Sequence, residues 1–124
     1  MTPEWFIAGP TATEFYTPER CHITELMNSP LSPETSLAVA RVEPGVTTQL
    51  HSLTGVTERY VVRKGEGVVE VDGVTTPLVV GAQAVIGAGV SQRITNTGTT
   101  DLEFYCLCTP RFMPESYVNL EGDD

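Results

Sequence analysis

Apolar and polar residues alternate in short runs along most of the chain, and this period of two is the pattern of half-buried β-strands. Glycine, proline, asparagine and serine end the runs, so turns recur about every eight to twelve residues. No segment keeps the period of a helix for longer than a turn or two. The sequence therefore predicts an antiparallel β-sandwich or barrel. The alternating runs lie at 20–27, 36–43, 67–71, 74–80, 83–86, 91–96 and 102–109.

The segment 45–65 carries the side chains with the most chemical potential. An alternating run in its first half directs Gln49 and His51 to one side of a predicted strand. In its second half, Glu58 and Tyr60 share one side of the next predicted strand. If these two strands pair, His51 and Glu58 face each other across the ladder.

Three regions are expected along the chain. Residues 1–19 are rich in proline, and we expect them to form an irregular arm whose aromatic side chains cover part of the barrel or a partner subunit. Residues 20–113 form a single barrel domain, in which Asp72-Gly73 signals a two-residue hairpin with a type I′ turn. Residues 114–124 form a C-terminal tail with a short turn of helix before an acidic end.

Length and charge narrow the classes of function. A chain of 124 residues is long enough for one domain with a sizeable core but too short for a second. The net charge of -9 excludes nucleic acid and anionic membrane as partners, because phosphate binding needs a basic surface. No run approaches the roughly 18 apolar residues of a spanning helix. The N-terminus also lacks the features of a signal peptide, so we expect a cytoplasmic protein.

The three cysteines are expected to be free thiols. Their odd number and the lack of a CxxC pair argue against a zinc site. Cys106 and Cys108 lie two residues apart in a strand-like run, where a disulfide would be badly strained. Both are in phase with Phe104, so they line the barrel if Phe104 points inward. They are then either small core residues or thiols near a metal ion.

Glycines and polar residues recur at the spacing of a two-motif pattern. The first motif, GxxxxxHxHxxxxExxxxxxG, is matched by Gly45, His51, Glu58 and Gly65, with Leu53 where the second His belongs. The second motif, GxxxxxPxGxxHxxxN, is matched by Gly81, Gly89 and Asn96, with Gly87 in place of the Pro and Gln92 in place of the His. With both motifs present, residues 36–109 resemble the cupin superfamily.

The resemblance implies an all-β fold, a double-stranded β-helix or jelly-roll barrel that is mostly antiparallel and often a homodimer. In metal-binding cupins, two His and one Glu of the first motif and one His of the second hold a divalent ion inside the barrel. Here His51 and Glu58 carry over unchanged. Gln92 offers an amide oxygen, and Gln49 is placed to fill the gap that Leu53 leaves. Such a donor set suits Zn, Mn, Fe(II) or Ni, with weaker binding than an intact site.

Two functions of different classes follow. The first is a metal-dependent cupin that acts on a small organic molecule as an isomerase, a cyclase or a dioxygenase. In that reading Glu58 is the natural general base if it does not ligate the ion, and Tyr60 is a candidate proton donor. The alternative is a metal-free binding module that holds a small ligand in the same cavity without catalysis, which the loss of two His ligands favours. A purely structural dimer would instead fill the barrel with side chains.

Structural roles are open for the same residues. His51 taken alone fits a hydrogen-bonded core histidine, and Glu58 fits a surface charge that pairs with Arg41 or Arg93. Tyr60 could equally have a purely structural role on a barrel strand. At a lost ligand position, Gln92 fits a neutral replacement in a site that no longer binds metal.

Overall fold

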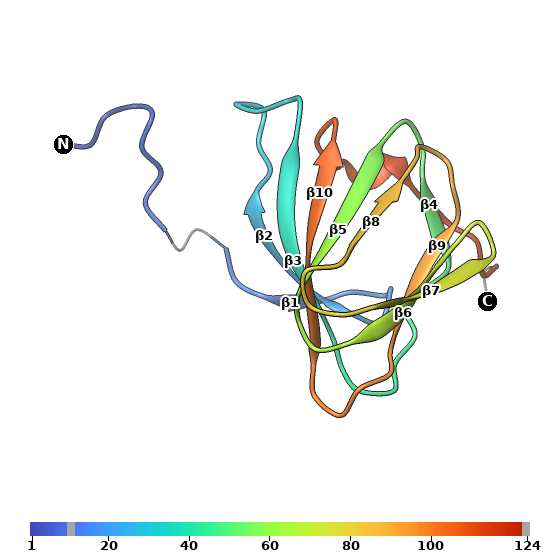
Figure 1. Ribbon diagram of the computed structural model, residues 1–124. Helices are drawn as coiled ribbons and strands as arrows, with labels where there is room; N and C mark the ends of the chain where they lie inside the picture. The colour runs from blue at the N-terminus through green and yellow to red at the C-terminus, as the bar shows by residue number, and fades with distance from the viewer. Residues whose placement is uncertain (10–11, 123–124) are drawn as a thin grey trace.

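Two antiparallel sheets face each other in the computed structural model, which describes residues 1–9 and 12–122 (Figure 1). The six-stranded sheet has the spatial order β1 (Phe15–Tyr16), β2 (His22–Met27), β3 (Ser36–Val42), β10 (Leu102–Thr109), β5 (Thr57–Lys64) and β8 (Gln83–Ile86). The five-stranded sheet has the order β11 (Tyr117–Asn119), β4 (His51–Leu53), β9 (Gln92–Asn96), β6 (Gly67–Val71) and β7 (Val74–Leu78). A short 3₁₀ helix spans Pro114–Ser116. The all-β double-stranded β-helix is thus confirmed.

The core lies between the sheets because successive side chains of a strand point to opposite faces. In β10, Leu102, Phe104, Cys106 and Cys108 are buried, and the residues between them are less so. Side chains of both sheets, from β5 in one to β9 in the other, form one apolar cluster. Full burial of such a side chain contributes about 1.5–3 kcal/mol. The inward phase expected for both cysteines is therefore confirmed.

Two turns show why their residue types are needed. Asp72 and Gly73 have φ values of 51° and 79°, as a type I′ hairpin between β6 and β7 requires. Gly65, the last glycine of the first motif, has a φ of 83°. A Cβ atom there would lie 2.6 Å from the carbonyl oxygen of Asp101. Any other residue at position 65 would be both strained and in collision with the backbone.

The predicted pairing of the two strands in segment 45–65 is wrong. The alternating run before His51 forms no strand, apart from a single bridge between Thr47 and Thr95, and β4 begins only at His51. β4 pairs with β9 and β11, whereas β5 pairs with β10 and β8. His51 and Glu58 therefore lie in opposite sheets. The alternation identifies strands, but strand partners depend on contacts between distant parts of the chain.

The ends of the chain extend the sheets beyond the range 20–113. β1 pairs with β2, and β11 pairs with β4. Residues 1–9 run away from the barrel (Figure 1), and Trp5 keeps 82% of its surface exposed. Pro10 of the expected arm and the acidic end at residues 123–124 lie outside the described residues. Within the described residues, no helix has the length and apolar character needed to cross a membrane.

Candidate functional site

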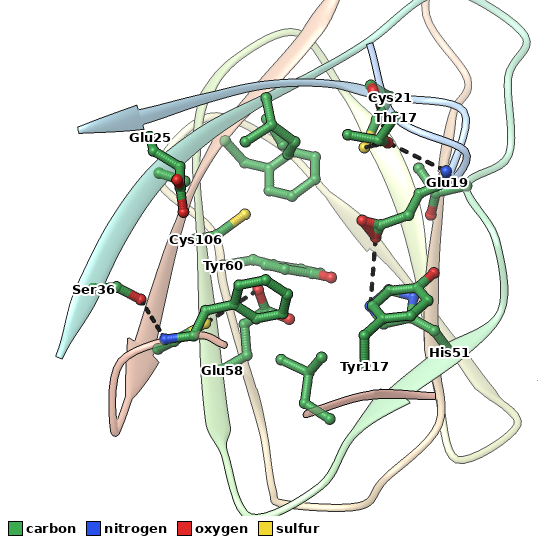
Figure 2. Close-up of a pocket in the computed structure, with 18 of the residues that line it drawn as sticks. Thr17, Glu19, Cys21, Glu25, Ser36, His51, Glu58, Tyr60, Cys106 and Tyr117 are labelled. Atoms are coloured by element: carbon green, nitrogen blue, oxygen red, sulfur yellow. Dashed lines mark hydrogen bonds and ion pairs between the residues drawn. The ribbon is translucent and has the colours of Figure 1, made fainter. Parts of the chain in front are cut away.

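A cavity of about 170 Å³ lies between the two sheets (Figure 2). His51 of β4 lines it from one sheet, and Glu58 and Tyr60 of β5 line it from the other. These three residues are buried, and two further polar residues, Glu19 and Tyr117, complete its polar lining near His51. The cavity therefore brings together three of the residues that the sequence singled out.

His51 is held in one tautomer by the backbone. Its Nδ1 atom lies 2.8 Å from the carbonyl oxygen of Gln49. Because a carbonyl can only accept a hydrogen bond, the proton sits on Nδ1 and Nε2 carries a lone pair. The ring also stacks on Tyr117, with 4.8 Å between the ring centroids. Burial lowers the pKa of His51, so the imidazole is neutral at pH 7 and Nε2 is a proton acceptor.

Glu58 is a buried carboxyl group with one unused oxygen. Its Oε2 atom accepts a hydrogen bond from Cys108 Sγ at 3.6 Å. Its Oε1 atom has no hydrogen-bond partner among the described residues. Burial, and then the nearby charge of Glu19, raise the pKa of Glu58 to about 7, while polar groups around the carboxyl oppose the rise. At neutral pH this carboxyl group can therefore either take or give a proton.

The surface alternative for Glu58 is wrong. Its side chain is buried, and the two arginines considered as partners bind other carboxylates. Arg41 donates to Glu14 and Asp101, and Arg93 donates to Glu70. Glu58 is therefore directed inward without a basic partner.

Gln92 lies directly opposite His51 across the β4–β9 ladder but does not line the cavity. Its side chain is almost fully buried, and its Oε1 atom accepts a hydrogen bond from the Tyr60 hydroxyl. The Tyr60 ring packs against Phe104, with 4.7 Å between the centroids. Burial raises the pKa of Tyr60, so the phenol stays neutral. The amide oxygen expected as a metal ligand thus accepts a hydrogen bond from Tyr60, and its side chain does not line the cavity.

Gln49 supports His51 instead of joining it on a strand face. It lies outside any strand and does not line the cavity. Its side-chain oxygen accepts a hydrogen bond from the Tyr117 hydroxyl, and its backbone carbonyl accepts the His51 Nδ1 proton. Both interactions fix the imidazole and the tyrosine ring that stacks on it.

The residues present do not fit the metal site with four ligands that the sequence predicted. The side-chain oxygens of Gln92 and Gln49 are both engaged in hydrogen bonds. Leu53, at the position of a third ligand, is buried and apolar. Within the described residues, no group of three or more His, Cys, Asp or Glu side chains is placed to hold a metal ion. Two strong donors remain, His51 and Glu58, on opposite sheets.

Glu19 is the main site residue that sequence reasoning missed. It lies in the loop between β1 and β2, and its Oε1 atom is 4.0 Å from His51 Nε2 (Figure 2). Burial raises the pKa of Glu19 to about 7, and the nearby Tyr117 hydroxyl group opposes the rise. The neighbouring Arg20 fixes the loop, because it donates to the Thr47 carbonyl at 2.9 Å. No periodicity marks this loop in the sequence, so no signal there could have identified Glu19.

The cysteines and the last matched residue of the second motif, Asn96, complete the description of the site. Cys106 and Cys108 line the cavity, and burial raises the pKa of both thiols, so they are not thiolates at neutral pH. Cys21, Cys106 and Cys108 are free, as expected. Asn96 of the second motif is structural: its side chain donates to the carbonyls of Val42 and Thr100.

Comparison with known proteins agrees with this fold. The family model described as "Cupin domain" matches residues 38–108. An oxalate-binding protein of Thermotoga maritima is 39% identical over 67 residues, which cover 54% of this chain and 55% of that protein. The chain thus spans about half the length of this curated relative.

Solved structures give the same architecture. A predicted oxalate decarboxylase of Thermotoga maritima has a TM-score of 0.71 and 27% identity, covering 81% of this chain and 92% of its own. A Streptomyces Pac13 variant with uridine has a TM-score of 0.80 and 13% identity, covering 98% of this chain and 95% of its own. Pac13 is a nucleoside dehydratase, and at this identity the likeness shows the fold alone. With the two sheets, the motif spacing and the family match in agreement, this chain belongs to the cupin family.

Proposed function

We propose that the barrel cavity binds a small organic molecule and that the chain transfers protons on it with its own side chains. One observation supports this most directly. His51 and Glu58 come from opposite sheets, line the same cavity, and each keeps an acceptor atom, Nε2 and Oε1, without a hydrogen bond from any described residue. Buried acceptors without partners are costly, and a bound molecule would satisfy them.

Glu58 acts as the general base in this proposal. A carboxylate in a buried site accepts a proton best when its pKa lies near the working pH. Burial raises the pKa of Glu58 to about 7, so a large fraction is ionised at neutral pH and the proton it gains is easily lost again. Glu58 therefore removes a proton from one position of the ligand.

Glu19 returns a proton to a second position. The Glu19 carboxyl, with its pKa raised to about 7, carries a proton in part of the molecules at neutral pH. That proton passes directly to the ligand, and Nε2 of His51, 4.0 Å from Glu19, orients the ligand by accepting a hydrogen bond from it. One proton is removed and one is returned, so the reaction is an isomerisation or a cyclisation with no change of oxidation state. Tyr60 fixes the wall beside Glu58, because its own proton is donated to Gln92.

The metal-dependent form of the proposal has weaker support. It would require His51, Glu58, Gln92 and Gln49 to hold a Zn, Fe, Mn or Ni ion, and both amide oxygens are engaged elsewhere. The unpartnered Oε1 atom of Glu58 is the observation in its favour. Stoichiometric metal in protein purified without chelator, lost in a His51→Ala variant, would establish it in place of the metal-free form.

The experiment has a binding stage and a chemical stage. Small organic molecules with carbon-bound hydrogen, with uridine first because a solved structure of similar fold contains it, are screened by two-dimensional NMR for shifts of cavity residues. Compounds that bind are then incubated with protein in D₂O, and mass spectrometry measures deuterium incorporated into the ligand. We expect incorporation with the native chain, none with Glu58→Gln, and full incorporation with Glu66→Gln, which alters an exposed carboxyl group.

Three other outcomes would contradict the proposal in part or as a whole. Binding without incorporation identifies a binding module without catalysis. If Glu58→Gln incorporates deuterium at the native rate, Glu58 is not the base. A screen with no shifts at His51, Glu58 or Tyr60 overturns the proposal as a whole.

We also propose that the chain is a homodimer. Trp5, Phe6 and Ile7 are exposed on an arm that runs away from its own barrel (Figure 1), which leaves these side chains available to a second copy. Light scattering on the native chain and on a variant lacking residues 1–9 tests this. We expect the native chain to be a dimer and the shortened chain to be a monomer, and a monomeric native chain would contradict it.

A further inference from the structure

The side chains that line the cavity include acidic residues but no Lys or Arg among the described residues. Three carboxyl groups line it, those of Glu19, Glu25 and Glu58. The chain as a whole carries a net charge of -9. A low-dielectric cavity with ionised carboxyl groups, a neutral imidazole and no Lys or Arg has a negative potential, which attracts cations and repels anions.

The nearby arginines are held away from the cavity. Arg20 follows Glu19 in the chain, but its guanidinium group donates to Glu121 at 2.8 Å and to the Thr47 carbonyl at 2.9 Å. Arg41 is held by Glu14 and Asp101 on the outer side of the sheet. The carboxyl groups in the cavity therefore receive no counterion from these arginines.

Glu58 shows that a donor is missing inside the cavity. Its side chain is 8% exposed, and its Oε1 atom has no hydrogen-bond partner among the described residues. The polar groups beside it are the Gln92 amide, the Cys108 thiol and the Tyr60 phenol, and the phenol donates its proton to Gln92. A ligand with an N–H donor would supply the missing hydrogen bond, and a positive charge on that donor would strengthen it.

Aromatic rings form much of the remaining wall. Tyr60 and Phe104 pack together, and Tyr117 stacks on His51. Phe112 also lines the cavity. The face of an aromatic ring attracts a cation, so these rings and the carboxyl groups favour the same kind of ligand. The cavity volume of about 170 Å³ slightly exceeds the roughly 150 Å³ of an engineered protein cavity that holds benzene.

We infer that the cavity is selective for a small organic cation, with an ammonium group between the carboxyl groups of Glu19 and Glu58 and an apolar part against the aromatic rings. This inference rests on the proposed function, because it names the class of molecule that the same cavity binds. The ammonium donates to Glu58 Oε1 and to Glu19. A molecule with a carboxylate at the same place would meet like charges and no donor.

The test uses three probes of nearly equal shape and different charge: benzylamine, benzyl alcohol and benzoate. At pH 8 the amine is protonated, because alkylammonium groups titrate near pH 10. NMR titration of the native chain gives a Kd for each probe. We expect benzylamine to bind at least roughly tenfold more tightly than benzyl alcohol, as a charged hydrogen bond does, and benzoate not to bind.

Variants assign the selectivity to the carboxyl groups. Glu58→Gln and Glu19→Gln keep the size of the side chain. Each should raise the Kd of benzylamine about tenfold and leave the Kd of benzyl alcohol unchanged. Glu66→Gln, which alters an exposed carboxyl group, should change neither. Glu19 lies in a loop, so its variant provides the result if Glu58→Gln fails to fold.

The outcomes separate this inference from the proposed function. If benzyl alcohol or benzoate binds at the cavity as tightly as benzylamine, the cation selectivity is overturned while binding of a small molecule in the cavity stands. If the native chain favours benzylamine and neither variant changes that preference, the roles of Glu19 and Glu58 are overturned. If none of the three probes binds, the cation selectivity is overturned, and the screen of small molecules decides separately whether the proposed function stands.

Discussion

The Oε1 atom of Glu19 lies 4.0 Å from Nε2 of His51, and Nδ1 of the same ring donates to the Gln49 carbonyl. A loop carboxyl group outside both sequence motifs thus faces the free nitrogen of the motif histidine. Since the chain has two histidines, ¹⁵N-correlated NMR can resolve both rings, and a His22→Gln variant assigns His51. We expect His51 to be protonated on Nδ1 alone at pH 7.5.

The same spectra test the pKa of His51. Burial lowers this pKa from the ordinary value of 6.5, so His51 should remain largely neutral as the pH falls through 6.5. Titration of His51 at or above pH 6.5, or a proton on Nε2 in place of Nδ1, would contradict the geometry described.

The buried cysteines should react slowly in the folded protein. Reaction with a disulfide reagent requires a thiolate, and burial raises the pKa of Cys21 to about 12 and the pKa of Cys106 and Cys108 as well. We expect colourimetric labelling at pH 8 to be at least roughly tenfold slower in native protein than in guanidinium. Rapid labelling of the native chain would show that the cavity opens to solvent far more than its structure indicates.

The fold was predictable from the sequence to the extent that it depends on local pattern. Alternation located β5, β6, β9 and β10 to within about a residue or two, and Asp72-Gly73 located the hairpin between β6 and β7. The pairing of strands was not predictable in the same way, because β4 and β5 are neighbours in the chain but join opposite sheets. Which strands meet depends on packing between distant segments.

The site was predictable where a motif fixes spacing, and not elsewhere. Motif spacing singled out His51 and Glu58, and both line the cavity. Glu19 and Tyr117 come from a loop before the first motif and from the C-terminal strand β11. Each reaches His51 only through folding of the chain ends onto the barrel. A sequence pattern of local period carries no information on such contacts.

Asn96 should be essential for stability although it is not a ligand. Its side chain donates to the carbonyls of Val42 and Thr100 and accepts from the Gly98 amide. Asn96→Ala leaves these backbone groups without partners, at a cost of about 1 kcal/mol or more each, so about 3 kcal/mol in total. Urea unfolding measures this. Thr97→Ala, at the exposed neighbour, should stay within about 0.5 kcal/mol of the native chain.

If the free energy of unfolding of Asn96→Ala falls by less than about 1 kcal/mol, water replaces the hydrogen bonds of the side chain. Asn96→Asp separates the two halves of the network, because it keeps the acceptor for Gly98 and loses the donor for the carbonyls. The lost donor becomes a buried carboxylate oxygen that faces the two carbonyls, so this variant should be no more stable than Asn96→Ala at neutral pH.

A third strong donor beside His51 and Glu58 should create a metal site. Leu53 is buried, lines the cavity beside His51, and occupies the position of a ligand in the first motif. Leu53→His should gain a Zn²⁺-dependent rise in Tm. Binding to the folded state alone stabilises it by about 2.7 kcal/mol when free metal is a hundredfold above Kd. Calorimetric scans with and without Zn²⁺ measure the gain.

Leu53→Met is the matched control, because it alters the same core position without adding a donor, and its Tm should not respond to Zn²⁺. A second change, His51→Ala, should abolish the gain in Leu53→His. A native chain that already shows the full Zn²⁺ response would contradict the conclusion that its donor set does not fit a metal ion.

Removal of the Glu58 charge should stabilise the protein above neutral pH. Burial, and then Glu19, raise the pKa of Glu58 to about 7, and Tyr60, Cys106 and Cys108, which also face it, stay uncharged. A raised pKa means that the folded state holds the proton longer than the unfolded state, whose value is about 4.5. The stabilisation from that proton is complete below pH 4.5 and is lost as the pH rises through 7.

Glu58→Gln carries no such charge, so its stability relative to the native chain should rise between pH 4.5 and pH 7 and stay constant above. From the shift of the Glu58 pKa, we expect the free energy of unfolding of Glu58→Gln to exceed that of the native chain by about 3 kcal/mol above pH 7. Urea unfolding at pH 5 and pH 8 measures the difference, and Glu66→Gln at an exposed site should show none. A variant less stable than the native chain at pH 8 would mean that the ionised Glu58 has a partner in solution, which would also remove the reason to assign it as the base.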